Sequence, residues 1–139
     1  DGYLIVAYSD GKINKVPMSQ IIDKKPGTPQ KMYGEKAPMF VSPAKKDAAL
    51  LTGYEDEKGK RCFRLDKIAD MPDGKMLSEG STLVDVEIKQ MFFCDVIDHK
   101  YYADLKRLQN FKRSSIGMQL LSNYGTEEQK VLKSIGIEL

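Results

Sequence analysis

Residues 4–21 read LIVAYSDGKINKVPMSQI. An apolar run leads into the pair Asp10-Gly11, and a more polar segment returns from it and ends at Ile21. An Asp-Gly pair between two such segments is a strong short-range signal for a β-hairpin. We therefore predict a hairpin at the start of the chain.

The same pattern returns twice further along the chain. Residues 50–68 read LLTGYEDEKGKRCFRLDKI, with a longer turn. Tyr8 and Tyr54 are 46 positions apart and Ile21 and Ile68 are 47 apart, so the two copies keep a nearly constant register. A weaker third copy spans residues 92–108, where His99 replaces the turn glycine. Histidine is among the few other residues enriched at positive φ, so we expect a turn there as well.

A hairpin in every 40 to 50 residues, roughly, is the spacing of one blade in a propeller-like array. The remaining strands of each blade are expected at Pro38–Val41 and Thr82–Ile88, with connecting loops over residues 23–36 and 69–81. Residues 126–129 read TEEQ, which has the spacing of a helix capping box, so a short C-terminal helix is expected. Residues 114–124 fit neither a helix nor a strand clearly.

The length of 139 residues corresponds to one ordinary domain or a fragment of a larger one. We expect the repeats to divide it into blade-like units followed by a tail. The expected division is residues 1–36 for the first repeat, 37–81 for the second, 82–110 for a divergent third, and 111–139 for the tail with its helix.

Composition narrows the class of protein. Hydrophobic residues make up 41% and charged residues 30%, which excludes disorder along the whole chain. The longest apolar runs are far below the roughly 18–20 residues that cross a membrane. Cys62 and Cys94 lack the spacing of a metal or redox motif, which favours a reduced, cytoplasmic setting. The opening Asp1-Gly2 indicates a piece of a longer protein without a signal peptide.

The first hairpin also resembles the blade motif in the C-terminal domain of bacterial type IIA topoisomerase A subunits, the gyrase and topoisomerase IV family. In that motif an apolar strand leads to a turn glycine, a basic residue, then Val/Thr-Pro-Leu and a closing apolar residue. Lys15, Pro17 and Met18 match it. Residues 77–86, LSEGSTLVDV, are similar to the opening strand of a family blade. The resemblance covers residues 3–108, or about three blades.

This resemblance implies a mainly β fold of pinwheel-like blade repeats that binds double-stranded DNA non-specifically along a basic rim and bends or wraps it. DNA cleavage would belong to another part of an ATP-dependent topoisomerase, so this domain would not be catalytic. Its partners would be DNA, the remainder of the A subunit and the B subunit, in the cytoplasm at the nucleoid. No cofactor and no membrane contact are implied.

Basic residues recur on or just after the returning strand of each copy, and stacked blades would bring them to one rim. The alternative is that they form the solvated face of antiparallel strands. Lysine predominates over arginine, which favours contacts with phosphates over reading of bases. The candidate DNA-binding residues are Lys12, Lys15, Lys60, Arg61, Arg64, Lys100, Lys106 and Arg107.

Other chemistry has weaker support. Tyrosines such as Tyr54, Tyr101 and Tyr102 are typical of stacking platforms for nucleic acid, but their apolar neighbours favour core packing. His99 beside Asp98 suggests a hydrolase triad, yet no serine stands in a G-x-S-x-G motif. One histidine and two distant cysteines do not make a zinc site, and no phosphate-binding glycine loop occurs.

Two other classes of protein stay open. A small SH3-like or Tudor-like protein-interaction barrel also contains an apolar strand, an Asp-Gly turn and a polar strand. Residues 62–68 are faintly similar to a sheet segment of WYL-type ligand-sensing regulators. Neither alternative requires the constant register between the first two hairpins.

Overall fold

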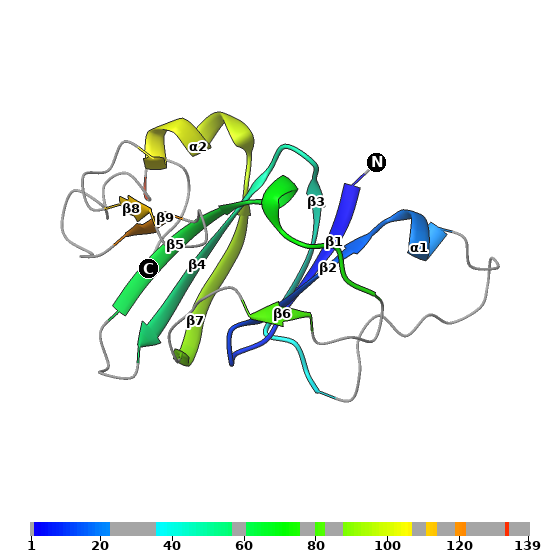
Figure 1. The fold of residues 1–139 in the computed structure, drawn as a ribbon, viewed down its shortest axis with the longest axis horizontal. Coiled ribbons are helices and arrows are strands. Elements are labelled where there is room, and N and C mark those ends of the chain that lie inside the picture. Colours follow the sequence, from blue (N-terminus) through cyan, green and yellow to red (C-terminus); the bar gives the residue numbers. More distant parts are fainter. Residues whose placement is uncertain are drawn as a thin grey trace.

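Two antiparallel sheets form most of the computed structural model, and they lie side by side (Figure 1). The structure describes residues 2–22, 36–56, 61–75, 80–82, 88–106, 111–113, 119–121 and 133.

The first sheet has the strand order β3-β1-β2-β6. It contains the first predicted hairpin, in which Leu4 lies opposite Val16. Gly11 has a φ of 93° in the turn, where a residue without Cβ is favoured. This hairpin is confirmed. The strands are β1 (Gly2–Ala7), β2 (Lys12–Pro17), β3 (Phe40–Lys45) and β6 (Ser81–Thr82), and α1 (Ser19–Ile22) follows β2.

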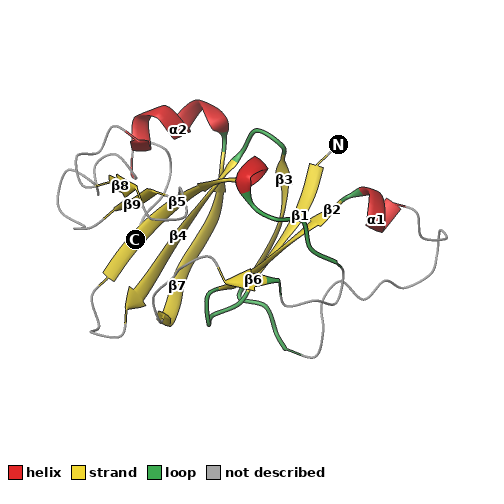
Figure 2. Ribbon diagram, in the orientation of Figure 1, coloured by secondary structure: helices red, strands yellow, loops and turns green. Residues whose placement is uncertain are grey.

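The second sheet has the order β7-β4-β5-β9-β8. The second predicted hairpin is confirmed, because β4 and β5 pair antiparallel with Leu51 opposite Leu65. A helix, α2, lies across one end of this sheet (Figure 2). The elements are β4 (Ala49–Asp56), β5 (Arg61–Lys67), the short 3-10 helix η1 (Ile68–Asp70), β7 (Ile88–Ile97), α2 (His99–Lys106), β8 (Phe111–Arg113) and β9 (Gln119–Leu121).

The third predicted hairpin is wrong. Its outward strand exists within β7, but β7 pairs with β4, and the chain then enters α2. Asp98 begins this helix: its carboxylate accepts a hydrogen bond from the Lys100 backbone N–H at 3.0 Å, and its carbonyl accepts one from Tyr101 N–H at 3.0 Å. An aspartate at this position satisfies N–H groups that the helix leaves unpaired, so residue 99 opens a helix instead of a turn.

Alternation along the strands builds two apolar cores. Leu50 on β4 and Ile5 on β1 belong to a cluster to which both sheets contribute. Leu51, the next residue of β4, points to the other face of the second sheet, where it joins Phe63 and the partly buried Tyr102 of α2. The second sheet is therefore buried on both faces near β4, which explains why consecutive residues at the start of β4, Ala49, Leu50 and Leu51, are all apolar.

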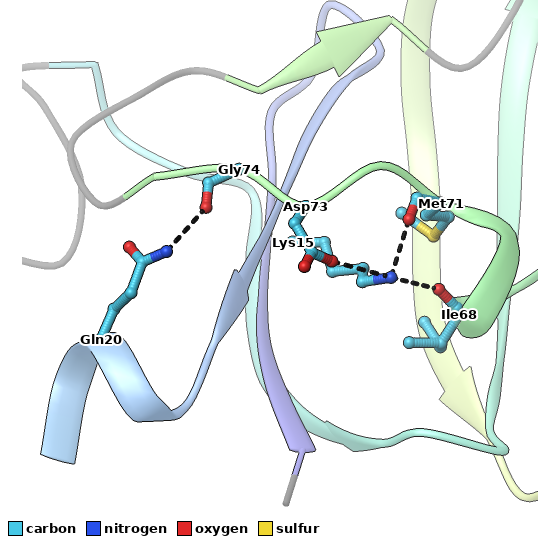
Figure 3. A network of polar contacts seen from close by, with 6 residues as sticks. All are labelled: Lys15, Gln20, Ile68, Met71, Asp73 and Gly74. Atoms are coloured by element: carbon cyan, nitrogen blue, oxygen red, sulfur yellow. Dashed lines mark hydrogen bonds and ion pairs between the residues drawn. The ribbon is translucent and has the colours of Figure 1, made fainter.

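A buried lysine joins the first sheet to the segment that follows β5 (Figure 3). The Lys15 ammonium donates to the carbonyl oxygens of Ile68 at 2.8 Å and Met71 at 2.7 Å, and it lies 3.2 Å from Asp73 Oδ1. Its Nζ is also 4.3 Å from the centroid of the Tyr3 ring. Lys15 is only 2% exposed. A charge so deeply buried is tolerated because all its donors find partners.

The segment after η1 then runs along β2. Gly74 N–H donates to the Lys15 carbonyl at 2.7 Å, and Asn14 Nδ2 donates to the Lys75 carbonyl at 2.7 Å. Gly80 has a φ of 83°, and a Cβ there would lie 2.1 Å from the Ile13 carbonyl oxygen. A glycine is therefore required where the chain comes back to β2 as β6.

The other expectations fall partly within the described residues. The strand predicted at Pro38–Val41 corresponds to β3, which begins at Phe40, and the undecided residues 114–124 contain β9. Residues 83–87 of the predicted strand and 23–35 of the predicted loop lie outside the described residues, as does the predicted C-terminal helix except for Lys133, which is helical.

The division into repeats at residues 36, 81 and 110 stays a prediction. Strands pair across those boundaries, since β3 pairs with β1 and β7 pairs with β4. Within the described ranges, none of the helices is long and apolar enough to span a membrane.

We predict that Lys15→Met destabilises the fold by about 3 kcal/mol, because it keeps the aliphatic stem and leaves buried carbonyl oxygens without their donor. Urea unfolding measures this change. Lys45→Met, the same substitution at an exposed position of β3, serves as the control and should change stability little. Equal stability of the two variants would contradict the role assigned to Lys15.

Candidate functional site

Four exposed lysines gather at one end of the fold because of the strand register. Ala49, the first residue of β4, lies opposite Lys67 on one side and Ile97 on the other. The β3–β4 turn, the end of β5 and the start of α2 therefore meet at the same end of the second sheet. We call the exposed side chains there the basic cluster, which consists of Lys45, Lys46, Lys67, His99 and Lys100.

Two carboxylates lie within the basic cluster. His99 Nδ1 is 3.2 Å from Asp47 Oδ2 and 3.2 Å from Asp98 Oδ1. The hydrogen bond from Lys100 N–H, aided by the charges of His99, Lys100 and Lys45, holds the pKa of Asp98 below its ordinary value. Within the basic cluster and its two carboxylates, the four lysines outnumber the acids, so this group of described side chains carries a net positive charge.

A cleft of about 300 Å³ opens within the basic cluster. Lys67 Nζ lies 5.2 Å from the centroid of the Tyr102 ring, a distance at which a cation is attracted to the ring face. Lys100 Nζ lies 4.9 Å from the centroid of Tyr101. The lining residues of the cleft are Lys46, Asp47, Ala48, Lys67, Ala69, His99 and Tyr102.

The structure brings few of the candidate DNA-binding residues predicted from sequence to this cluster. Lys100 belongs to it, and Lys12 is half-buried on β2, in the first sheet. The other predictions fall elsewhere: Lys60 and Arg107 lie outside the described residues, and so do the side chains of Arg61 and Lys106.

The predicted exposure of Lys15 and Arg64 on a basic rim is wrong, since each is 2% exposed. Lys15 holds the segment after η1, as described above. Arg64 donates from Nε to Asp66 Oδ2 at 3.0 Å and from Nη2 to Asp66 Oδ1 at 3.2 Å. Two residues apart on a strand, these side chains share a face, and pairing is what allows an arginine to be buried.

Sequence reasoning missed Lys67 as a member of the site. It lies at the end of a copy of the hairpin, where the pattern alone gives no sign of what packs beside it. Lys45 and Lys46 stand out in the sequence only as loop residues. The register that joins all three to Lys100 involves strands far apart in the chain.

Two titratable groups outside the basic cluster, Asp66 and Cys94, are buried. Burial raises the pKa of Asp66 to about 6, against the opposing charge and hydrogen bonds of Arg64. Burial also raises the pKa of the Cys94 thiol, which therefore stays protonated and is a poor nucleophile. Among the described residues no group of three or more His, Cys, Asp or Glu side chains is placed to hold a metal ion.

Comparisons with known proteins support the fold. No protein-family model matches the chain, and no curated protein sequence matches it. A crystal structure of the C-terminal domain of DNA topoisomerase IV is similar, with a TM-score of 0.51 and 15% sequence identity. The match covers 78% of this chain and 36% of that one, so the chain spans little more than a third of the domain's length. The predicted mainly β, pinwheel-like fold is confirmed.

We predict that ionisation of Asp66 makes stability depend on pH. Its folded-state pKa of about 6 lies above the ordinary value of 3.8, so the folded chain holds a proton that the unfolded chain releases. The free energy of unfolding should therefore fall as the pH rises from 4 to 6, by at most about 1.4 kcal/mol per pH unit, and then level off.

Urea unfolding of the wild type and of Asp66→Asn over this pH range tests the prediction. The variant cannot ionise at this position. The difference in free energy of unfolding between the two proteins should therefore show the pH dependence that Asp66 causes, because the contributions of the other titrating groups cancel. Parallel pH profiles would show that the Asp66 pKa is not raised.

Proposed function

We propose that this chain is a non-catalytic, duplex-DNA-binding domain of a type IIA topoisomerase A subunit, and that the basic cluster contacts the phosphate backbone. The observation that carries the proposal is the meeting of four exposed lysines at one end of the sheets in a fold similar to the C-terminal domain of DNA topoisomerase IV. These exposed lysines come from three separate elements, and packing of the protein interior does not require them.

The chemistry of the cluster favours backbone binding without sequence specificity. A lysine ammonium acts as a point charge that suits phosphate oxygens, whereas reading of guanine in the major groove is typical of the planar arginine fork. The cluster contains lysines and one histidine, and no arginine. Each phosphate that it neutralises releases condensed counterions, so binding should weaken steeply with salt.

The residues proposed to contact DNA follow from exposure. Lys45, Lys46, Lys67 and Lys100 come first, with Lys12 on β2 as an additional contact. Lys60, Arg61, Lys106 and Arg107 stay in the proposal on the strength of the sequence pattern. Lys15 and Arg64 leave it, because their partners within the protein hold them in the interior.

The wider assembly follows as part of the same proposal. The domain would bind or bend a DNA segment beside the cleavage machinery carried by the rest of the A subunit and would act together with a B subunit. It would work in the cytoplasm, at the nucleoid. It requires no cofactor for this role.

We predict that the chain binds a labelled duplex of random sequence, about 40 base pairs long, with an affinity that falls steeply as salt rises. The triple substitution Lys46→Gln, Lys67→Gln and Lys100→Gln should weaken binding and lower the log–log salt slope by roughly one unit for each lysine removed. Fluorescence anisotropy over a salt series measures both quantities.

Lys36→Gln with Lys75→Gln is the control, which removes two positive charges where the test variant removes three. Both lysines lie outside the basic cluster, and Lys36 forms an ion pair with Asp10 beside the β1–β2 turn, at the opposite end of β1 from Lys45. The control should keep nearly the full salt slope. Absence of binding by the wild type at low salt would refute the proposal and favour a protein-interaction or ligand-sensing domain.

A further inference from the structure

The basic cluster surrounds a cleft, and a flat patch of lysines would have been enough to hold a duplex backbone. The volume of about 300 Å³ lies at the lower end of the range of small-molecule sites, roughly 300–1,000 Å³. It therefore admits one ring-sized group with its substituent. A paired base inside a duplex cannot enter such a space, because its partner and its stacked neighbours hold it.

The walls of the cleft combine two kinds of chemistry. Ala48, Ala69 and the Tyr102 side chain supply apolar and aromatic surface. Lys46 and Lys67 supply positive charge at the same opening, and Lys67 is held over the Tyr102 ring. The carboxylate of Asp47 is engaged by His99, which reduces its repulsion of an anion. An anionic group attached to a flat apolar ring complements both.

We propose that this cleft receives a single unpaired nucleotide of a DNA strand: its phosphate binds Lys46 and Lys67, and its base takes the place of the Lys67 ammonium over the Tyr102 ring. The inference rests on the proposed function, since it takes DNA as the occupant of the surrounding cluster. Aromatic side chains bind bases of any sequence by stacking, and lysines bind the phosphates between them. A base that is already unpaired enters without the cost of opening a pair.

The consequence is a preference for imperfect duplexes. A duplex with one unpaired nucleotide should bind about tenfold more tightly than the fully paired duplex of the same length and sequence, as one stacking contact contributes. The preference should resist salt better than the overall affinity does, because stacking is not an ionic contact.

The test uses the whole chain and two labelled duplexes that differ only by a single extra nucleotide in one strand. Ala69→Leu places a larger side chain at the exposed wall of the cleft without changing any charge. Ala37→Leu makes the same change at an exposed position next to Lys36, away from the cluster, and is the control. Anisotropy titrations give the ratio of the two dissociation constants for each protein.

We expect a ratio near ten for the wild type and for Ala37→Leu, and a ratio near one for Ala69→Leu. A wild-type ratio of one would overturn the inference while leaving the proposed function intact. Absence of binding to either duplex would overturn both. A ratio of ten that persists in Ala69→Leu would place the unpaired nucleotide outside this cleft. A ratio of one and an absence of binding are both measured on the wild type, so these two tests hold even if a variant folds poorly.

Discussion

The Lys15 ammonium, withdrawn from water between the first sheet and the turn after β5, is the constraint on which the rest of the arrangement depends. An ammonium has three protons to donate, and here two carbonyl oxygens and the Asp73 carboxylate accept them. Those carbonyls belong to Ile68, the first residue of η1, and to Met71, which directly follows η1. The charge therefore fixes where the chain goes after the second hairpin, and a shift of η1 would leave it buried and unpaired, which costs several kcal/mol.

The position of η1 in turn fixes part of the basic cluster. Ile68 N–H donates to the Ala48 carbonyl at 3.0 Å, so η1 also holds the end of the β3–β4 turn. Ala69 of η1 and Ala48 of that turn are both walls of the cleft. The interior lysine and the surface lysines thus have different tasks. Lys15 fixes the course of the backbone, and that backbone positions the exposed lysines of the basic cluster.

Local signals predicted much of this fold. Asp10-Gly11 and the constant register between the first two copies identified both hairpins, because a turn and alternating strands are determined by neighbours in sequence. The third copy failed because Asp98 acts as a helix cap, and tyrosines at consecutive positions fit a helix that covers a sheet as well as they fit a strand. The pattern could not tell these apart without the apolar face of β4 and β5 that α2 covers.

The candidate site was harder to predict than the fold. A basic residue on a strand looks the same in sequence whether it is paired inside or free outside. For Arg64 the sequence does contain a local indication of burial, because its partner Asp66 lies on the same face of β5. The partners of Lys15 lie more than fifty positions away along the chain. The members of the basic cluster come from three elements that only the pairing of β4 with both of its neighbours brings together.

The first sheet is completed by a strand that comes late in the chain. β6 pairs Ser81 with Ile13, after the chain has passed through the whole second hairpin. Closing so long a loop costs entropy that only the finished contacts recover, and contacts of this range slow folding. The two sheets therefore cannot fold independently, one after the other. They form a single cooperative unit, and a cut between them would leave β2 with an open edge ready to pair with another chain.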